Sequence, residues 1–317
     1  MTNSNRMKKH IMRIGLIDVD GHVDKNNCHF PNLALMKISM YHKSLGDSVE
    51  WVNYIEQYDK VYMSKIFTFS PEPKVSIQAN EVIQGGTGYN ISSKLPKEIE
   101  NCDPDYSIYP NCDYSIQFFS RGCIRDCPFC LVRKKEGNIK PSRIMALNPN
   151  GKGIEVLDNN FFANPHWRDA VEYLNNTKQL VNLHGVDIRI MNEEQTHALN
   201  SMRLKGSSIH IAWDNPKDDI LPNLIDMLKQ VKRYKVSCYV LIGYWSTPEE
   251  DDYRVRKLLE LGVDPFVQPY RDYNNERIPT QYEKDFAGWA NKKERLKSFP
   301  FSDFSPRKGF KCSAYFK

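Results

Sequence analysis

The sequence predicts an α/β protein in which a small doubly wound (Rossmann-like) unit precedes a larger parallel sheet of barrel type. Three observations lead to this prediction. Strand and helix patterns alternate along most of the 317 residues, the connecting loops are short, and the alternation breaks between Pro104 and Asp113. We therefore divide the chain into residues 1–110, residues 111–272 and a C-terminal segment, residues 273–317.

The first part begins with an apolar strand and a helix whose apolar residues recur at helical spacing until Gly46 ends it. Two β-rich runs follow, and then a strand that ends in the pair Gly85-Gly86. This order is typical of a doubly wound parallel sheet. The expected strands are 12–18, 48–52, 60–68 and 81–86, and the expected helix is 32–45.

The second part repeats strand then helix six times, which favours a parallel, barrel-like sheet. The expected strands are 114–119, 153–157, 186–190, 208–213, 236–243 and 265–270. Helices are expected near 166–175, 192–204, 221–234 and 248–261. Beyond residue 272 we expect a loop, a helix over 281–297 and an aromatic, basic tail. The tail is expected to pack across the open sheet, with stacking on nucleic-acid bases as the alternative.

Composition describes an ordinary folded protein, with 40% hydrophobic and 26% charged residues. No apolar run reaches the roughly 18–20 residues that span a bilayer, so we expect no membrane partner. The basic N-terminus lacks the apolar stretch of an export signal, and we expect a cytoplasmic protein. A formal net charge of +5 permits an anionic partner without requiring one.

Three of the eight cysteines form the motif C-x3-C-x2-C: Cys123, Cys127 and Cys130. Their thiolates lie within eight residues, so one short loop can bring them to a single metal. Zinc sites and cubane clusters normally take four protein ligands, and no fourth Cys or His follows at ligand spacing. Three ligands and an open position suit a [4Fe–4S] cluster, while structural zinc in a non-catalytic protein is the alternative. The remaining cysteines are expected to be buried or free thiols.

The motif, with Phe129 before its last cysteine and a strand before it, resembles the radical SAM superfamily. The resemblance covers roughly residues 114–271 and implies a partial (β/α)6 TIM-like barrel. It implies that the open iron chelates S-adenosylmethionine, and that an electron from the cluster cleaves the sulfonium to start hydrogen abstraction from an unidentified substrate. It also implies contact between Phe129 and the adenine, and a reducing partner such as flavodoxin or ferredoxin.

Functional residues of parallel barrels lie at the carboxyl ends of the strands. After the second strand, Asp158 and Asn159 stand where the family contacts the SAM amino group, with an Asx turn or helix cap as the alternative. Arg189 is a candidate for the SAM carboxylate, with structural pairing to Asp187 as the alternative. The other candidates are Asp214 for ribose or substrate, Gly243 beside adenine, and Gln268 and Tyr270 toward the substrate.

The first part resembles the cobalamin-binding-type domain that precedes some radical SAM barrels. The matching residues are Asp20 and His22 after the first strand, Ser64-Lys65-Ile66, and Gly85-Gly86. His22 would be the lower axial ligand of a corrinoid, oriented by Asp20. Lys25 stands where the fingerprint needs glycine, so we expect cobalamin not to bind tightly. A cobalamin-dependent radical SAM methyltransferase is the remaining alternative.

Overall fold

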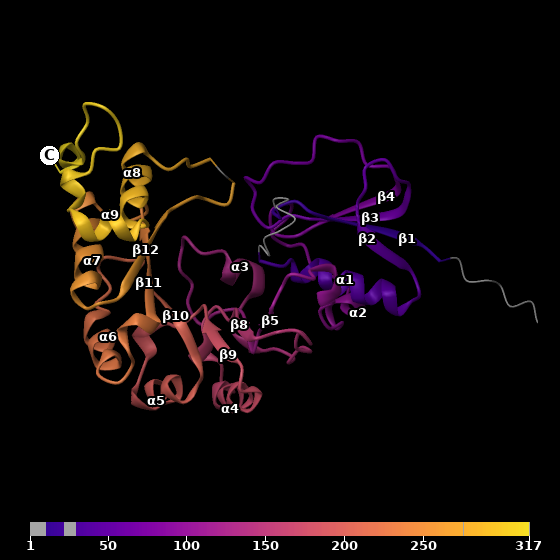
Figure 1. The fold of residues 1–317 in the computed structure, drawn as a ribbon, viewed down its shortest axis with the longest axis horizontal. Coiled ribbons are helices and arrows are strands. Elements are labelled where there is room, and N and C mark those ends of the chain that lie inside the picture. Colours follow the sequence, from indigo (N-terminus) through magenta and orange to yellow (C-terminus); the bar gives the residue numbers. More distant parts are fainter. Residues whose placement is uncertain (1–10, 22–29, 275, 317) are drawn as a thin grey trace, which may run out of the picture. The chain divides into compact units, whose positions relative to one another are not determined.

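A computed structural model describes residues 11–21, 30–274 and 276–316 of the chain (Figure 1). The chain divides into two compact units, Met1–Asp113 and Tyr114–Lys317, each with its own parallel sheet. The division falls at the end of the segment in which the sequence pattern breaks. Residues 273–317 belong to the second unit rather than forming a part of their own.

The sheet of the first unit has four parallel strands in the order β2-β1-β3-β4. Each strand lies within a few residues of the one predicted, and the parallel arrangement is confirmed. The bounds are β1 Arg13–Asp18, β2 Ser48–Trp51, β3 Tyr58–Ser64 and β4 Ala79–Gly85.

Helical segments cover one face of this sheet. Helix α1 (Leu33–Ser44) begins at Asn32, whose side chain accepts a hydrogen bond from the Leu35 amide, and it buries Leu35 and Met36 against β1. The short helix α2 (Lys97–Glu100) and the 3-10 turn at 106–108 pack into the same core.

The opposite face of the first sheet packs against loops. The parallel strands of the expected doubly wound arrangement are therefore present, but among the described residues no second layer of helices covers this face. The connection between β3 and β4 carries Pro71 and Pro73, and proline removes a backbone donor that a helix needs. A loop therefore replaces the second helical layer there.

The second unit contains a sheet of six parallel strands in the order β12-β11-β10-β9-β8-β5. A separate antiparallel pair, β6 and β7, follows β5. The bounds are β5 Tyr114–Gln117, β6 Ser120–Arg121, β7 Lys140–Pro141, β8 Gly153–Val156, β9 Leu180–Leu183, β10 Leu204–Ala212, β11 Val236–Ile242 and β12 Asp264–Pro269.

Four helices follow one another along one face of this sheet (Figure 1). Alternate strand residues, such as Val181 and Leu183 of β9, point to that face and join the helices in one apolar core. The helices are α4 Trp167–Thr177, α5 Glu193–Ser201, α6 Leu221–Leu228 and α7 Pro248–Glu260. Because all six strands run in parallel, their carboxyl ends lie along one edge, where the connecting loops bring functional side chains together.

One strand differs from the sequence prediction. The third strand is β9, Leu180–Leu183, and the predicted segment 186–190 is a loop that ends in a 3-10 turn, Ile188–Ile190. The Asp187 side chain accepts a hydrogen bond from the Arg189 amide, which favours a turn over an extended strand. Asp187 and Arg189 therefore lie on the loop beyond β9 and not within a strand, as the expected strand 186–190 had placed them.

The C-terminal segment packs against the second unit's core. The predicted helix over 281–297 is two helices, α8 (Gln281–Ala290) and α9 (Lys293–Ser298), followed by 3-10 turns at 301–303 and 312–315. Phe301 is fully buried and contacts Phe286 and Trp289. The aromatic residues of this segment thus extend the core.

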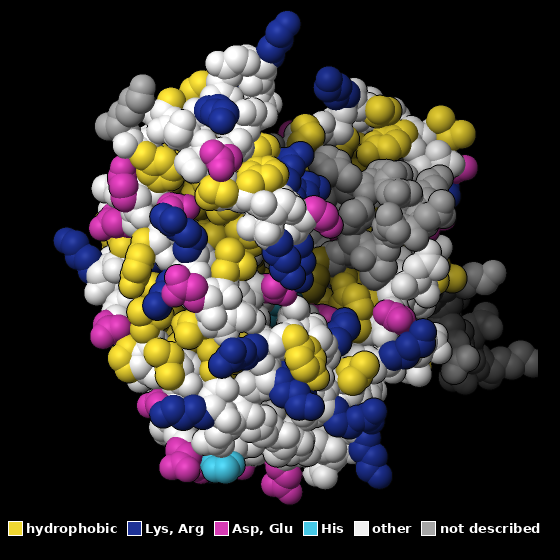
Figure 2. Space-filling model, turned by 60° about the vertical axis from the view of Figure 1, so that its left-hand side comes forward, with side chains coloured by type: hydrophobic (Ala, Val, Ile, Leu, Met, Phe, Trp, Pro, Cys, Tyr) yellow, Lys and Arg dark blue, Asp and Glu magenta, His cyan; other side chains and the backbone are white. Residues whose placement is uncertain are grey.

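Basic and acidic side chains lie among one another on the face shown in Figure 2. The modest excess of basic residues is therefore not gathered there into one large patch. Among the described residues, no helix has the length and apolar character needed to cross a membrane.

Candidate metal centre and ligand cavity

The three motif cysteines lie on the loop that follows β5, the first strand of the six-stranded sheet. The pair β6–β7 closes this loop, with Ser120 opposite Pro141 and Arg121 opposite Lys140. A short helix, α3 (Val132–Glu136), lies between the last cysteine and β7. The loop is therefore bounded on both sides by ordered backbone.

Asp158 anchors the start of the cysteine loop. Its carboxylate is buried and accepts hydrogen bonds from the Phe119 amide at 2.8 Å and from the Ser120 hydroxyl at 2.5 Å. Burial raises the pKa of Asp158 to about 6, although these hydrogen bonds oppose the rise. Both carboxylate oxygens serve the protein, and Asp158 does not line the cavity described below.

Glu136 joins the two ends of the loop. One carboxylate oxygen accepts from the Arg121 guanidinium at 2.5 Å, and the other accepts from the Gly122 amide at 2.8 Å and from the Asn159 side chain at 3.0 Å. Asn159, a predicted cofactor contact, therefore helps to hold the loop. Gly122 has φ +82°, and a Cβ there would lie 2.3 Å from the Asn138 carbonyl oxygen.

The thiols of Cys123, Cys127 and Cys130 are half-buried and form no disulfide. The loop backbone is fixed around them, since the Arg133 guanidinium donates to the Cys123 carbonyl at 2.9 Å and the Cys130 amide donates to the Cys127 carbonyl at 2.9 Å. Burial raises the pKa of Cys127 and Cys130, and the neighbouring thiols add to this rise.

Soft thiolate donors of this kind suit an iron–sulfur cluster or zinc. Among the residues that the structure describes, however, no three His, Cys, Asp or Glu side chains converge as metal ligands. To share one metal centre, the three thiols would have to turn toward a common point. Of the other cysteines, Cys112, Cys238 and Cys312 are buried, and Cys28 lies outside the described residues.

A cavity of about 230 Å³ lies beside Cys127. It brings together four residues that the sequence singled out: Cys127, Phe129, Arg189 and Asp214. The complete lining is Arg125, Asp126, Cys127, Pro128, Phe129, Arg189, Asp214, Asn215, Asp218 and Trp245. The cysteine loop thus forms one wall, and the loops after β9, β10 and β11 form the others.

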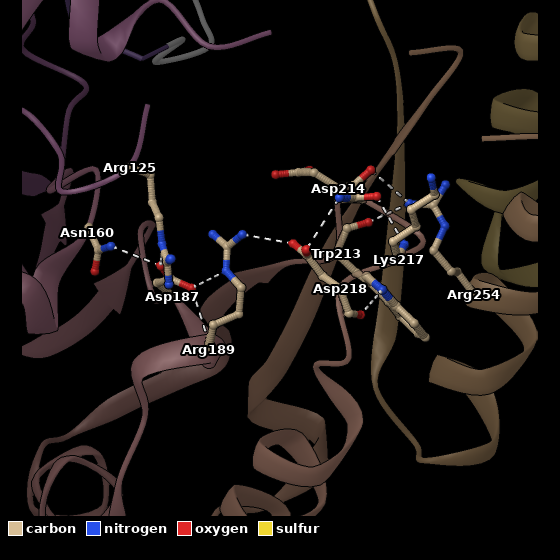
Figure 3. A network of polar contacts seen from close by, with 10 residues as sticks. Arg125, Asn160, Asp187, Arg189, Trp213, Asp214, Lys217, Asp218 and Arg254 are labelled. Carbon is tan, nitrogen blue, oxygen red and sulfur yellow. Dashed lines mark hydrogen bonds and ion pairs between the residues drawn. The ribbon is translucent and has the colours of Figure 1, made fainter. Parts of the chain in front are cut away.

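Asp187 links the cysteine loop to the loop after β9 (Figure 3). Its carboxylate accepts hydrogen bonds from Arg125 at 2.9 Å, from Arg189 at 2.7 Å and from the Asn160 amide at 3.2 Å. Burial alone would raise the pKa of Asp187, but the two guanidinium groups outweigh it, and the pKa lies below its usual value.

Arg189 is held on two sides, because a second nitrogen of its guanidinium donates to Asp218 at 2.9 Å (Figure 3). Its Nε and Nη1 atoms are thus engaged by carboxylates, while Nη2 carries no hydrogen bond to a described residue. Arg189 therefore combines the predicted structural pairing with a position on the cavity wall.

Asp214 contributes a carboxylate to the opposite side of the cavity. Among the described residues, none donates a hydrogen bond to its side chain. Burial raises the pKa of Asp214 to about 6, and the positive charges of Arg189 and Arg254 oppose this rise. Near neutral pH this group is an anion able to accept hydrogen bonds from a hydroxyl or an ammonium group.

Aromatic rings form the apolar side of the cavity. Phe129 makes edge-on contacts with Tyr244, at a centroid distance of 5.7 Å, and with Trp245, at 5.4 Å. Tyr244 in turn packs edge-on against Tyr270, at 4.7 Å. Phe129 therefore connects the cysteine loop to the segment that follows β11.

Gly243, Gln268 and Tyr270 do not line the cavity. Gly243 has φ +77°, and a Cβ there would lie 2.5 Å from the Glu283 carboxylate, which pairs with Arg277. Close packing against this ion pair explains the glycine. Gln268 is exposed on β12, and Tyr270 contacts Tyr244, whose ring packs against the cavity residues Phe129 and Trp245.

In the first unit, Asp20 holds the loop after β3. Its carboxylate accepts hydrogen bonds from the Ile66 amide, from the Phe67 amide at 3.1 Å and from the Ser70 hydroxyl at 2.6 Å. Asp20 thus has a structural role of its own, whereas His22 and Lys25 lie outside the described residues. Gly86 lies in the turn after β4. It has φ +97° and passes against the Lys65 backbone.

Several cavity residues were missed from the sequence: Arg125, Asn215, Asp218 and Trp245. Each lies one to four residues from a position that was identified, on a loop whose path the sequence pattern does not define. Arg125 is inside the cysteine motif, and Trp245 follows Gly243 closely. Charged or aromatic residues immediately after a predicted strand end were the available signal.

The comparisons with known proteins give no identity. The sequence matches no model of a known protein family, and a search of curated proteins finds no match.

Proposed function

We propose that this protein is a radical SAM enzyme that reductively cleaves S-adenosylmethionine to start hydrogen abstraction from a substrate. The observation that carries the proposal is the cavity, in which Cys127 of the three-cysteine loop lies beside an aromatic ring, a guanidinium and a carboxylate. The parallel sheet supports the proposal further, because the cysteine loop follows its first strand. On this proposal the six strands form a partial (β/α)6 barrel.

Cys123, Cys127 and Cys130 would hold three irons of a [4Fe–4S] cluster. When bound, the cluster supplies the electron that breaks a carbon–sulfur bond of the sulfonium. The chain's own residues bind and orient S-adenosylmethionine beside it. The aromatic rings around Phe129 offer apolar surface to the adenine and exclude water from the reacting groups.

Charged groups of the cavity match the remaining parts of S-adenosylmethionine. Arg189 would bind the carboxylate through Nη2 rather than through a two-pronged contact, because Asp187 and Asp218 engage its other nitrogens. Asp214 would accept hydrogen bonds from the ribose hydroxyls or the ammonium group. Asp158 and Asn159 would act indirectly, because they hold the cysteine loop and do not line the cavity.

The first unit has no part in this proposal as a corrinoid site. Among the described residues, the Asp20 carboxylate binds the loop at 66–70, which is a structural role. We keep the expectation that cobalamin does not bind tightly.

The test replaces each motif cysteine by alanine in protein purified without oxygen. We expect Cys127→Ala to lose the cluster absorbance and the formation of 5′-deoxyadenosine together. The matched control is Cys312→Ala, a buried thiol in the C-terminal segment, which should keep the wild-type iron and sulfide content. Wild-type cleavage of S-adenosylmethionine by Cys127→Ala would refute the proposal. Stoichiometric zinc instead of iron and sulfide would favour the structural zinc site.

A further inference from the structure

Arg254 of α7 is fully buried, and its charge is met by hydrogen bonds on every side. An arginine has five N–H donors. Nε donates to the Glu250 carbonyl at 3.4 Å, Nη1 to the Trp213 and Asp214 carbonyls at 2.6 and 3.3 Å, and Nη2 to the Leu241 carbonyl at 2.9 Å and to Asp251 at 2.6 Å. So complete a set of partners fixes the guanidinium in one place.

The carbonyls that Arg254 binds belong to the ends of two neighbouring strands. Trp213 and Asp214 follow β10 directly, and Leu241 is the penultimate residue of β11. Figure 3 shows the guanidinium beside the chain at Trp213 and Asp214. Arg254 therefore ties together the two strand ends from which the cavity loops depart.

The counter-charge is also held in place. Asp251 is fully buried and accepts a second hydrogen bond, from the Tyr282 hydroxyl of α8, at 2.8 Å. A buried charge without its partner is strongly destabilising. The Arg254–Asp251 ion pair is thus held rigidly inside the second unit.

The Asp214 side chain lacks such support, since no described residue donates a hydrogen bond to it. Its position depends on its own backbone, and the Asp214 carbonyl is one of the groups that Arg254 holds. The guanidinium and the cavity carboxylate are therefore coupled through a single residue.

We propose that Arg254 is a positioning residue that fixes the chain after β10 and thereby holds the Asp214 carboxylate in place for a ligand in the cavity. The effect of Arg254 on ligand binding rests on the proposed function, whereas its effect on the order of the chain after β10 does not. Arg254 does not line the cavity, so it acts on a ligand through Asp214.

The first measurement needs no ligand. Amide hydrogen exchange is compared between the wild-type chain, Arg254→Lys and the double variant Arg254→Gln/Asp251→Asn, which leaves no buried charge unpaired. We expect the double variant to speed exchange at 213–218 by about tenfold or more, with little change in Leu180–Leu183, and Arg254→Lys to restore part of the protection. The control is Arg256→Gln, because Arg256 lies on the same helix with an exposed side chain paired to Asp252.

The second measurement is the affinity for S-adenosylmethionine. We expect Asp214→Asn and the double variant each to weaken binding by about tenfold, the effect of losing one charged hydrogen bond. When Asp214→Asn is combined with Arg254→Gln/Asp251→Asn, the loss of affinity should be no larger than for Asp214→Asn or the double variant alone. Both changes act through the Asp214 carboxylate. A merely structural role would give losses that multiply.

Two results would overturn the inference: exchange at 213–218 that is unchanged or raised equally throughout the sheet, or multiplying losses of affinity. If the wild-type protein binds no S-adenosylmethionine, the proposed function fails. The exchange measurement then decides the role of Arg254 for the chain by itself.

Discussion

The carboxylate of Asp158 illustrates how a buried acid can support a functional loop without touching a ligand. It binds the backbone at Phe119 and the hydroxyl of Ser120, the two residues from which the cysteine loop starts. Burial disfavours its charged form and raises its pKa to about 6. The folded protein therefore binds a proton at this site more strongly than the unfolded chain does.

Asp158→Asn should make the stability of the protein less dependent on pH. A raised pKa contributes stability that is fully present below the unfolded value of 3.8 and is lost as the pH rises through about 6. The difference of about two pKa units corresponds to about 3 kcal/mol. We expect the free energy of unfolding of the wild type, relative to Asp158→Asn, to fall by about 2–3 kcal/mol between pH 4 and pH 7.

Urea unfolding at a series of pH values measures this difference. The asparagine side chain can still accept from the Phe119 amide and donate to Ser120, so the loop start is preserved. Asp219→Asn, at an exposed position, is the control and should give a curve parallel to that of the wild type. Parallel curves for Asp158→Asn would contradict the prediction.

At the scale of elements, the cysteine loop contains two glycines with positive φ and different surroundings. Gly122 and Gly137 both have positive φ, at +82° and +79°. A Cβ on Gly122 would lie 2.3 Å from the Asn138 carbonyl oxygen, whereas a Cβ on Gly137 would meet nothing within 4 Å. The two positions separate the effect of backbone conformation from that of contact.

Gly137→Ala should lower the free energy of unfolding by about 1–3 kcal/mol, because φ +79° with ψ −150° is a backbone conformation that essentially only glycine adopts. Gly122→Ala should lower it by more and should also reduce the iron bound per chain, because the β6–β7 pair has to open to admit the methyl group. Thermal unfolding and iron analysis of both variants test this. Equal effects of the two substitutions would show that the contact is unimportant.

Elements with strong patterns were predictable, and the exceptions have physical causes. The strand β11 and helix α7 fall within one residue of their predicted ends, because an apolar run and a Thr-Pro start define them. The segment at 186–190 has the alternation of a strand, but the Asp187 side chain turns the chain. Such local hydrogen bonds are invisible to periodicity.

The candidate site was predictable to the extent that it follows strand ends. Asp214 was found because it stands just after a predicted strand. Arg189 was found as a charged residue of the expected strand 186–190, which is a loop after β9 in the structure. Asp158 and Gly243 obeyed the same rule but serve the structure instead. Which residue of a loop faces a cavity depends on contacts with distant segments, and one sequence does not define these.

On the scale of the whole molecule, the sequence suggested a separate C-terminal part, and the structure joins it to the second unit. Phe286, Trp289 and Phe301 are all at most 1% exposed and belong to the same apolar core as the six-stranded sheet. The Asp251–Tyr282 hydrogen bond adds a polar link between α7 and α8. The C-terminal segment should therefore unfold with the sheet and not before it.

Phe301→Ala tests this expectation in the full chain. Removing a fully buried phenylalanine ring costs about 3–5 kcal/mol, because transfer energy and packing are both lost. We expect this loss in urea unfolding, together with faster amide exchange in strand β11, which lies in the same cooperative unit. Phe304→Ala is the matched control: Phe304 lies three residues away, is half-buried beneath Arg295, and should change stability by about 1 kcal/mol or less. If Phe301→Ala speeds exchange in the C-terminal segment alone, the segment is an independent part, as the sequence first suggested.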